Sequence, residues 1–132
     1  MGLILLGSST KGIDGWLNIS NHQKKTLLTP TEKPTTYLIP ITNEAPPWVI
    51  GKHSSLALRI STMPIIQTLN EILGCPIVST SANAHGKQPL QTKKQVEGEF
   101  LETLDYIVGG TCGTFNRPSS IIDIVTGKEI RS

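Results

Sequence analysis

Apolar positions in the first part of the chain predict two strands with two short helices between them. Residues 1–6 open with a β-like apolar run. Residues 13–28 carry apolar side chains at helical spacing and then a polar stretch, which predicts two short helices. Residues 37–41 are predicted to form a strand closed by a proline, and residues 46–48, Pro-Pro-Trp, a loop.

The middle of the chain gives the clearest pattern. Residues 55–60 predict a short strand, and Thr62 with Pro64 supplies a helix N-cap and first turn. Gly74 is predicted to end the helix, because glycine readily adopts the left-handed backbone conformation common at helix C-termini. Residues 76–78 follow as a second strand. The apolar positions of the helix share one face: Ile65, Ile66, Leu69, Ile72 and Leu73. A strand, a helix and a strand in such a short span predict a βαβ unit.

The last third of the chain predicts one more helix and three short strands. Thr92 caps the helix, and residues 106–108 are predicted to form a strand. Residues 120–125 and 128–131 are predicted to form two strands joined by a tight turn. Because no internal repeat or linker separates these elements, we expect one α/β domain over residues 1–132.

Composition narrows the class of protein. The chain has 132 residues, of which 37% are apolar, and no apolar run approaches the ~18 residues of a membrane span. Its net charge of +2 excludes a strongly basic nucleic-acid clamp but permits an anionic ligand. Cys75 and Cys112 form no CxxC pair, so neither a zinc site nor a disulfide framework is expected, and a cytoplasmic location fits best.

Hydroxyl, amide and guanidinium groups are the candidate ligand-binding groups. Residues 79–83, Ser-Thr-Ser-Ala-Asn, follow a predicted strand and suit phosphate or carboxylate oxygens, unless they only satisfy their own turn. Arg59 lies near the end of an apolar strand and is either an anion-binding residue or an ordinary surface or ion-paired arginine. Ser119 and Ser120 either bind a ligand or cap a loop, and Arg131 lies where disorder is the usual expectation.

Several common kinds of site are not predicted. His22, His53 and His85 have no spacing typical of a metal site, and no catalytic triad can be inferred from residue order. The chain contains neither GxGxxG nor GxxxxGK[ST]. We therefore expect no metal-ligand cluster and no covalent nucleophile, and any nucleotide would bind without a glycine-rich phosphate loop.

Three segments together resemble the YrdC/Sua5 family, in particular its short bacterial TsaC-like branch. They agree with the family pattern in order and spacing: residues 55–60 (SLALRI), residues 76–83 (PIVSTSAN) with Gly86 and Pro89, and residues 118–123 (PSSIID). Residues 34–40 resemble the family's Pro-x-Thr strand, and residues 128–131 its Arg-bearing last strand. The likeness covers nearly the whole chain.

The resemblance implies a fold and an activity. The fold would be α/β, a twisted mixed sheet with flanking helices. The activity would be that of an L-threonylcarbamoyladenylate synthase, a nucleotidyltransferase of tRNA threonylcarbamoyladenosine (t6A) biosynthesis. Such an enzyme condenses threonine, bicarbonate and ATP, with Mg²⁺, to threonylcarbamoyl-AMP and pyrophosphate. Other tRNA threonylcarbamoylation proteins would then be its partners.

The resemblance also implies roles for particular residues. One set would line the ATP/adenylate site: Ser55, Ser79, Ser81, Asn83 and Arg131. Arg59 and Ser120 would hold threonine. No catalytic nucleophile is needed, because the site has to position two anions and offset their repulsion while carbamate oxygen attacks the α-phosphorus.

The chain departs from the family pattern at its start. Members carry a Pro-Thr-[Asp/Glu] strand and a Lys-x-Arg motif before the position of Gly2, so we expect a domain without its N-terminal segment. Loss of those cations predicts weak ATP binding and poor turnover. Two alternatives remain: a non-catalytic RNA-binding or regulatory module using the same concave face, and a folding-compromised fragment. The low net charge argues against tight RNA binding.

Overall fold

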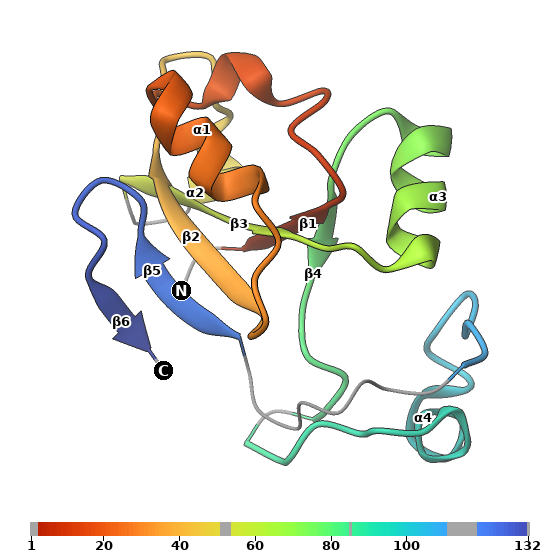
Figure 1. Cartoon of the computed structure of the whole chain (residues 1–132). Coiled ribbons are helices and arrows are strands. Elements are labelled where there is room, and N and C mark those ends of the chain that lie inside the picture. The colour runs from red at the N-terminus through yellow and green to blue at the C-terminus, as the bar shows by residue number, and fades with distance from the viewer. Residues whose placement is uncertain (1–2, 51–53, 85, 111–118, 132) are drawn as a thin grey trace. The chain divides into compact units, whose positions relative to one another are not determined.

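The computed structural model describes residues 3–50, 54–84, 86–110 and 119–131, and its Cα positions group into two units (Figure 1). Unit 1 comprises residues 1–79 and 118–132, and unit 2 comprises residues 80–117. Each unit is described by itself. Cys112, His53 and His85 lie outside the described residues. The expectation of one domain stays a prediction.

A six-stranded mixed sheet forms the framework of unit 1. Its strands are β1 (Ile4–Gly7), β2 (Thr35–Pro40), β3 (Ser55–Ile60), β4 (Ile77–Ser79), β5 (Ser120–Asp123) and β6 (Glu129–Arg131). Across the sheet their order is β4-β1-β3-β2-β5-β6. The pairs β1–β3 and β2–β5 are parallel, and the other three neighbouring pairs are antiparallel. The predicted mixed α/β sheet is confirmed.

The predicted βαβ unit is wrong, although its strand, helix and strand all form. β4 pairs with β1 in the antiparallel sense, and β1 lies between β4 and β3. The apolar β1 takes an interior position beside β3, while the three-residue β4, with Val78 half exposed, suits an edge. A local sequence pattern identifies the elements but not their order in a sheet.

Three short helical segments cover one face of the sheet. They are η1 (Asp14–Trp16), α1 (Asn21–Leu28) and α2 (Pro47–Ile50), and Figure 1 shows α1 above β2. The hydrophobic core lies beneath them: Leu5, Ile13, Leu27, Tyr37, Ile39, Val49, Leu56, Leu58 and Ile124. The two short helices predicted within residues 13–28 are confirmed as η1 and α1. The predicted loop at residues 46–48 is wrong in part, because α2 begins at Pro47, where proline suits a first helical turn.

Helix α3 (Pro64–Leu73) begins and ends on local signals. Pro64 occupies its first turn, but Met63, not the predicted Thr62, is the N-cap residue, and no side chain caps this end. Gly74 ends the helix at φ 75°, as predicted. The predicted apolar face is only partly covered by the described residues, since Ile72 is 74% exposed.

Unit 2 contains helix α4 (Lys93–Phe100) and irregular segments. Thr92 and Gln95 form a reciprocal capping box at its start, which confirms the predicted cap. The strand predicted at residues 106–108 is wrong: those residues form no strand, and Tyr106 is 81% exposed. A three-residue β-prone segment without a pairing partner cannot satisfy its backbone as a strand.

The turn between β5 and β6 forms as predicted. The Asp123 carboxylate accepts hydrogen bonds from the backbone N–H groups of Val125 and Thr126. Gly127 adopts φ 74° and donates its N–H to the carbonyl of Asp123.

Across the described ranges, no helix is long and apolar enough to cross a membrane.

Candidate functional site

One transverse row of the sheet carries both candidate arginines of unit 1, Arg59 and Arg131. Side chains directly opposite one another on neighbouring strands point to the same face. The register links Leu6 to Arg59, Arg59 to Thr36, Thr36 to Ile121, and Ile121 to Arg131. The residues that alternate with them on β2 and β3, Tyr37 and Leu58 among them, belong to the core beneath α1 and α2. We call the face that bears this row the Arg59 face.

Arg59 is one of the two cations of this row, with Arg131 at one end. Its side chain is half-buried, and burial lowers the pKa of the guanidinium from its usual value without discharging it. Within the described ranges it makes no hydrogen bond and no ion pair. A partly desolvated guanidinium without a partner is poised to bind a carboxylate or a phosphate.

A buried hydrogen-bond network lies beside Arg59. The hydroxyl oxygens of Thr36 and Ser119 are 2.6 Å apart, and both residues are buried. Arg131 donates through Nε and Nη2 to the carbonyl oxygen of Ser119, at 3.1 and 2.8 Å. β2, β6 and the residue that precedes β5 are therefore joined at this end of the sheet. The Arg131 guanidinium is partly committed to the protein itself.

Ser120 lies on the opposite face of the sheet from Arg59. The register pairs it with Thr35, one position from the Thr36–Ile121 pair. Its hydroxyl oxygen is buried and has no hydrogen-bond partner in the part of the chain that the structure describes. The structure therefore brings Ser119, rather than Ser120, onto the Arg59 face.

Ser79 and Ser55 share the Arg59 face but lie farther along it. Ser79 pairs with Ile4, which in turn pairs with Ala57, two positions before Arg59. Ser55 stands four positions before Arg59 on β3, a separation of ~13 Å at the usual rise of a strand. A ligand that contacted both Ser55 and Arg59 would have to be extended along β3.

Ser81 and Asn83 belong to unit 2 and are described within it. Ser81 is exposed. Asn83 donates through Nδ2 to the carbonyl oxygen of Ala84, and its Oδ1 is buried with no partner among the described residues. The carbonyl of Ala82 accepts the N–H of Leu90, which closes a loop that contains Asn83 and begins directly after Ser81.

Sequence reasoning missed Thr36 as part of the site and passed over Ser119 in favour of its neighbour. Thr36 is fully buried. Because it directly follows Thr35, the sequence alone does not show which of the two threonines lies on the Arg59 face. Ser119 was weighed together with Ser120, and only strand register separates them. The sequence did identify Arg59, because a charged residue stands out in the apolar segment of residues 55–60.

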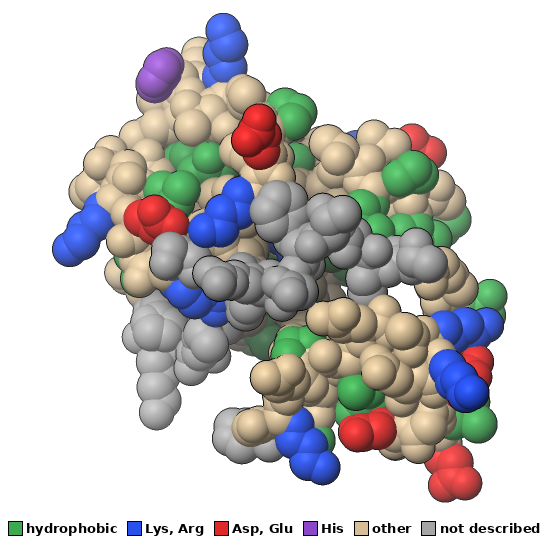
Figure 2. All heavy atoms as spheres, turned by 60° about the horizontal axis from the view of Figure 1, so that its bottom comes forward, with side chains coloured by type: hydrophobic (Ala, Val, Ile, Leu, Met, Phe, Trp, Pro, Cys, Tyr) green, Lys and Arg blue, Asp and Glu red, His purple; other side chains and the backbone are tan. Residues whose placement is uncertain are grey.

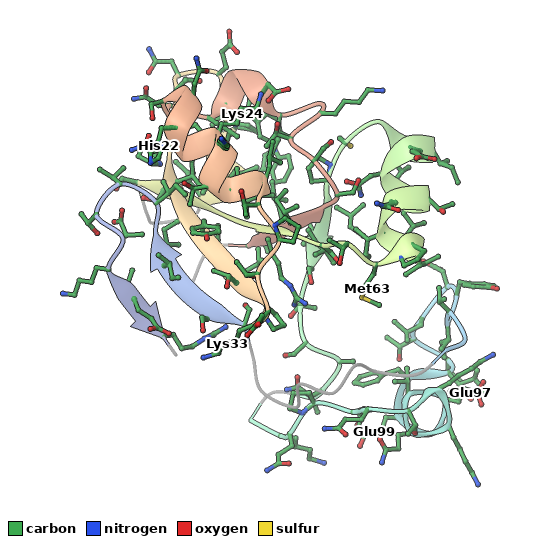
Figure 3. All side chains as sticks on the ribbon, in the orientation of Figure 1. His22, Lys24, Lys33, Met63, Glu97 and Glu99 are labelled. Carbon is green, nitrogen blue, oxygen red and sulfur yellow. The ribbon has the colours of Figure 1, made fainter. Side chains whose placement is uncertain are left out.

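Charged side chains of both signs are present and interspersed among the described residues on the face that Figure 2 shows. Lys33 lies just before β2, at the end of the strand nearest Thr36, while Met63 marks the start of α3 (Figure 3). No three His, Cys, Asp or Glu side chains of the described residues gather into a possible metal site.

Comparison with known proteins gives relatives over nearly the whole chain. The model of the Sua5/YciO/YrdC family, described as telomere recombination, matches residues 1–132. The threonylcarbamoyl-AMP synthase of Xanthomonas axonopodis pv. citri is 35% identical over 133 residues, covering 98% of this chain and 71% of the relative. The threonylcarbamoyl-AMP synthase of Marinobacter nauticus is 48% identical over 99 residues, covering 74% of this chain and 52% of the relative.

A solved structure shares the fold. The crystal structure of P. abyssi Sua5 complexed with L-threonine superposes with a TM-score of 0.80 at 22% identity, covering 97% of this chain and 38% of Sua5. At that identity the likeness concerns the fold alone. The sequence matches carry the family assignment, and they confirm the resemblance inferred from the three motifs: the chain belongs to the Sua5/YciO/YrdC family.

Proposed function

We propose that this chain is a threonylcarbamoyl-AMP synthase of t6A biosynthesis. Two relatives over most of the chain bear that name. In the proposed reaction the threonine amine and bicarbonate form a carbamate with loss of water. A carbamate oxygen then attacks the α-phosphorus of ATP, and pyrophosphate leaves. The protein's part in this reaction is to position two anions and neutralise their repulsion.

The half-buried guanidinium of Arg59, which has no partner among the described residues, is the observation that supports this proposal most. We assign it to the carboxylate of threonine, which it can bind through two parallel N–H donors. Ser119 also lies on the Arg59 face, at the end of the sheet where Thr36 pairs with Arg59, so we assign its hydroxyl as a second threonine contact. Ser120 stays the alternative contact, because its buried hydroxyl also lacks a partner among the described residues.

The nucleotide is proposed to bind through hydroxyl and amide groups together with one arginine. The proposed contacts are Ser55, Ser79, Ser81, Asn83 and Arg131. Ser55 and Ser79 support this assignment because they share the Arg59 face, and Arg131 because it keeps donors beyond those given to Ser119. Mg²⁺ is proposed to arrive with ATP as a substrate complex, held by the phosphates.

The product requires partners that transfer the threonylcarbamoyl group to tRNA, and we propose that this chain works with such proteins in the cytoplasm. A role in binding RNA directly receives less support. Tight RNA binding depends mostly on neutralising phosphates with lysine and arginine. The net charge is +2, and the charged side chains are interspersed in Figure 2.

The test is calorimetric titration of the chain with threonine and with ATP, in bicarbonate and Mg²⁺, followed by an assay for pyrophosphate release. Arg59→Ala is expected to weaken threonine binding by about 1–3 kcal/mol, or about five- to 150-fold. Lys33→Ala is the matched control, since Lys33 is an exposed cation near the same end of β2. Equal threonine affinity in wild type and Arg59→Ala would show that Arg59 does not bind the substrate.

A further inference from the structure

The Thr36 and Ser119 hydroxyls form one hydrogen bond with each other, so one of their two protons has no acceptor within the pair. Each hydroxyl has one proton to donate. At 2.6 Å, one of the two protons lies between the oxygens, and the second needs an acceptor elsewhere. Neither hydroxyl makes another hydrogen bond within the described ranges. The direction of the pair therefore decides which residue presents the free donor.

Burial favours one direction. The Thr36 residue is 0% exposed, whereas Ser119 is 8% exposed. If Ser119 donated to Thr36, the Thr36 proton would be enclosed with no acceptor among the described residues, and an unsatisfied buried donor costs stability. If Thr36 donates instead, its only proton is satisfied. The Ser119 hydroxyl can then donate its proton to a ligand or to water.

We propose that Thr36 is a positioning residue, which donates to the Ser119 hydroxyl and so fixes that hydroxyl as a hydrogen-bond donor on the Arg59 face. Arg131 holds the backbone of the same residue through its carbonyl oxygen. An anionic oxygen bound by Arg59 would thus meet a cation and an oriented neutral donor together. The inference rests on the proposed function, which makes this anion the carboxylate of threonine.

The binding test uses two substitutions of Thr36 and one matched control. Thr36→Val keeps the shape but removes the hydroxyl, and Thr36→Ser restores it. The control is Thr35→Val, which removes a hydroxyl that bonds the carbonyl of Lys33. Thr36→Val is expected to raise the Kd for threonine about tenfold and to leave the Kd for ATP within about twofold. Thr36→Ser and Thr35→Val are expected to bind threonine as wild type does.

A second readout needs no ligand. Proton NMR should show a protected hydroxyl resonance with nuclear Overhauser contacts to the Thr36 methyl group, absent in Thr36→Val and shifted in Ser119→Ala. A protected resonance that belongs to Ser119 instead, or no protected resonance, overturns the proposed direction of the bond whether or not substrate binds.

The outcomes separate this inference from the proposed function. If wild type binds threonine and Thr36→Val binds it equally well, the positioning role is wrong and the proposed function stands. If Thr36→Val loses threonine and ATP to the same extent, its effect is general and the positioning role is again wrong. If wild type binds no threonine, the proposed function is overturned, and with it threonine as the ligand of the Ser119 donor.

Discussion

Ser119 and Ser120 are neighbours along the chain, yet their hydroxyls lie on opposite faces of the sheet. Ser119 joins Thr36 and lies on the Arg59 face, whereas Ser120 pairs across strands with Thr35. The Ser120 hydroxyl is buried and has no partner among the described residues, which is a costly condition for a polar group. Strand alternation, with a period of two residues, produces this separation.

The two serines therefore respond differently to replacement by alanine. Ser119→Ala removes a donor from the proposed threonine site and is expected to weaken threonine binding about tenfold. Ser120→Ala removes an unsatisfied hydroxyl and is expected to raise the free energy of unfolding by about 1 kcal/mol, with threonine affinity nearly unchanged. Calorimetry and urea unfolding measure the two effects. Weaker threonine binding in Ser120→Ala alone would assign the contact to Ser120.

The loop after β1 is held against the end of α3 by close backbone packing. Gly12 has φ 88°, and a Cβ built on it would lie 2.5 Å from the carbonyl oxygen of Gly74 and 2.8 Å from the Cβ of Cys75. Both the backbone conformation and the space therefore require glycine. Gly98 in α4 differs, because a Cβ there would meet nothing within 4 Å.

The same substitution is expected to have opposite effects at these two glycines. Gly12→Ala should lower the free energy of unfolding by about 1–3 kcal/mol, because the added methyl group forces the backbone apart. Gly98→Ala should raise the stability of its helix by about 0.5–1 kcal/mol through helix propensity. Urea unfolding monitored by circular dichroism measures both changes. A Gly12→Ala protein as stable as wild type would contradict the packing at this loop.

Elements with local signals were predictable from the sequence, and those that depend on distant partners were not. The capping box at Thr92 and the left-handed Gly74 are encoded within a few residues. The placement of β1 between β3 and β4 depends on segments far apart in the chain. The site divides in the same way. Arg59 stands out within its own strand, while Thr36 and Ser119 are 83 residues apart and meet only through sheet register.

At the scale of the whole molecule, ion pairs between the described residues contribute little to stability. The described residues contain two, Lys24–Asp14 at 2.9 Å and Lys93–Glu97 at 3.8 Å, and both are exposed. Asp14 links η1 to α1 through Lys24, and its carboxylate also accepts a hydrogen bond from the Thr10 hydroxyl at 2.6 Å. This bond, followed by the contact with Lys24, lowers the pKa of Asp14 below its usual 3.8.

The lowered pKa fixes the sign of a pH effect. Because the folded protein binds the Asp14 proton more weakly than the unfolded chain does, Asp14 stabilises the fold above the unfolded pKa of 3.8. This contribution is lost as the pH falls below that value, through the folded pKa. Asp14→Asn is therefore expected to lower Tm near neutral pH and to narrow its difference from wild type in acid. A Tm difference that stays constant down to the acid limit would contradict this linkage.

The division of unit 1 into residues 1–79 and 118–132 has a consequence for folding during synthesis. The parallel partner of β2 is β5, and the whole of unit 2 is translated between them. Until β5 emerges from the ribosome, one edge of β2 has no strand beside it, although Tyr37 and Ile39 already belong to an apolar face. Contacts of such long sequence separation form slowly. The nascent chain is therefore most exposed to aggregation, and most in need of chaperones, while unit 2 is being made.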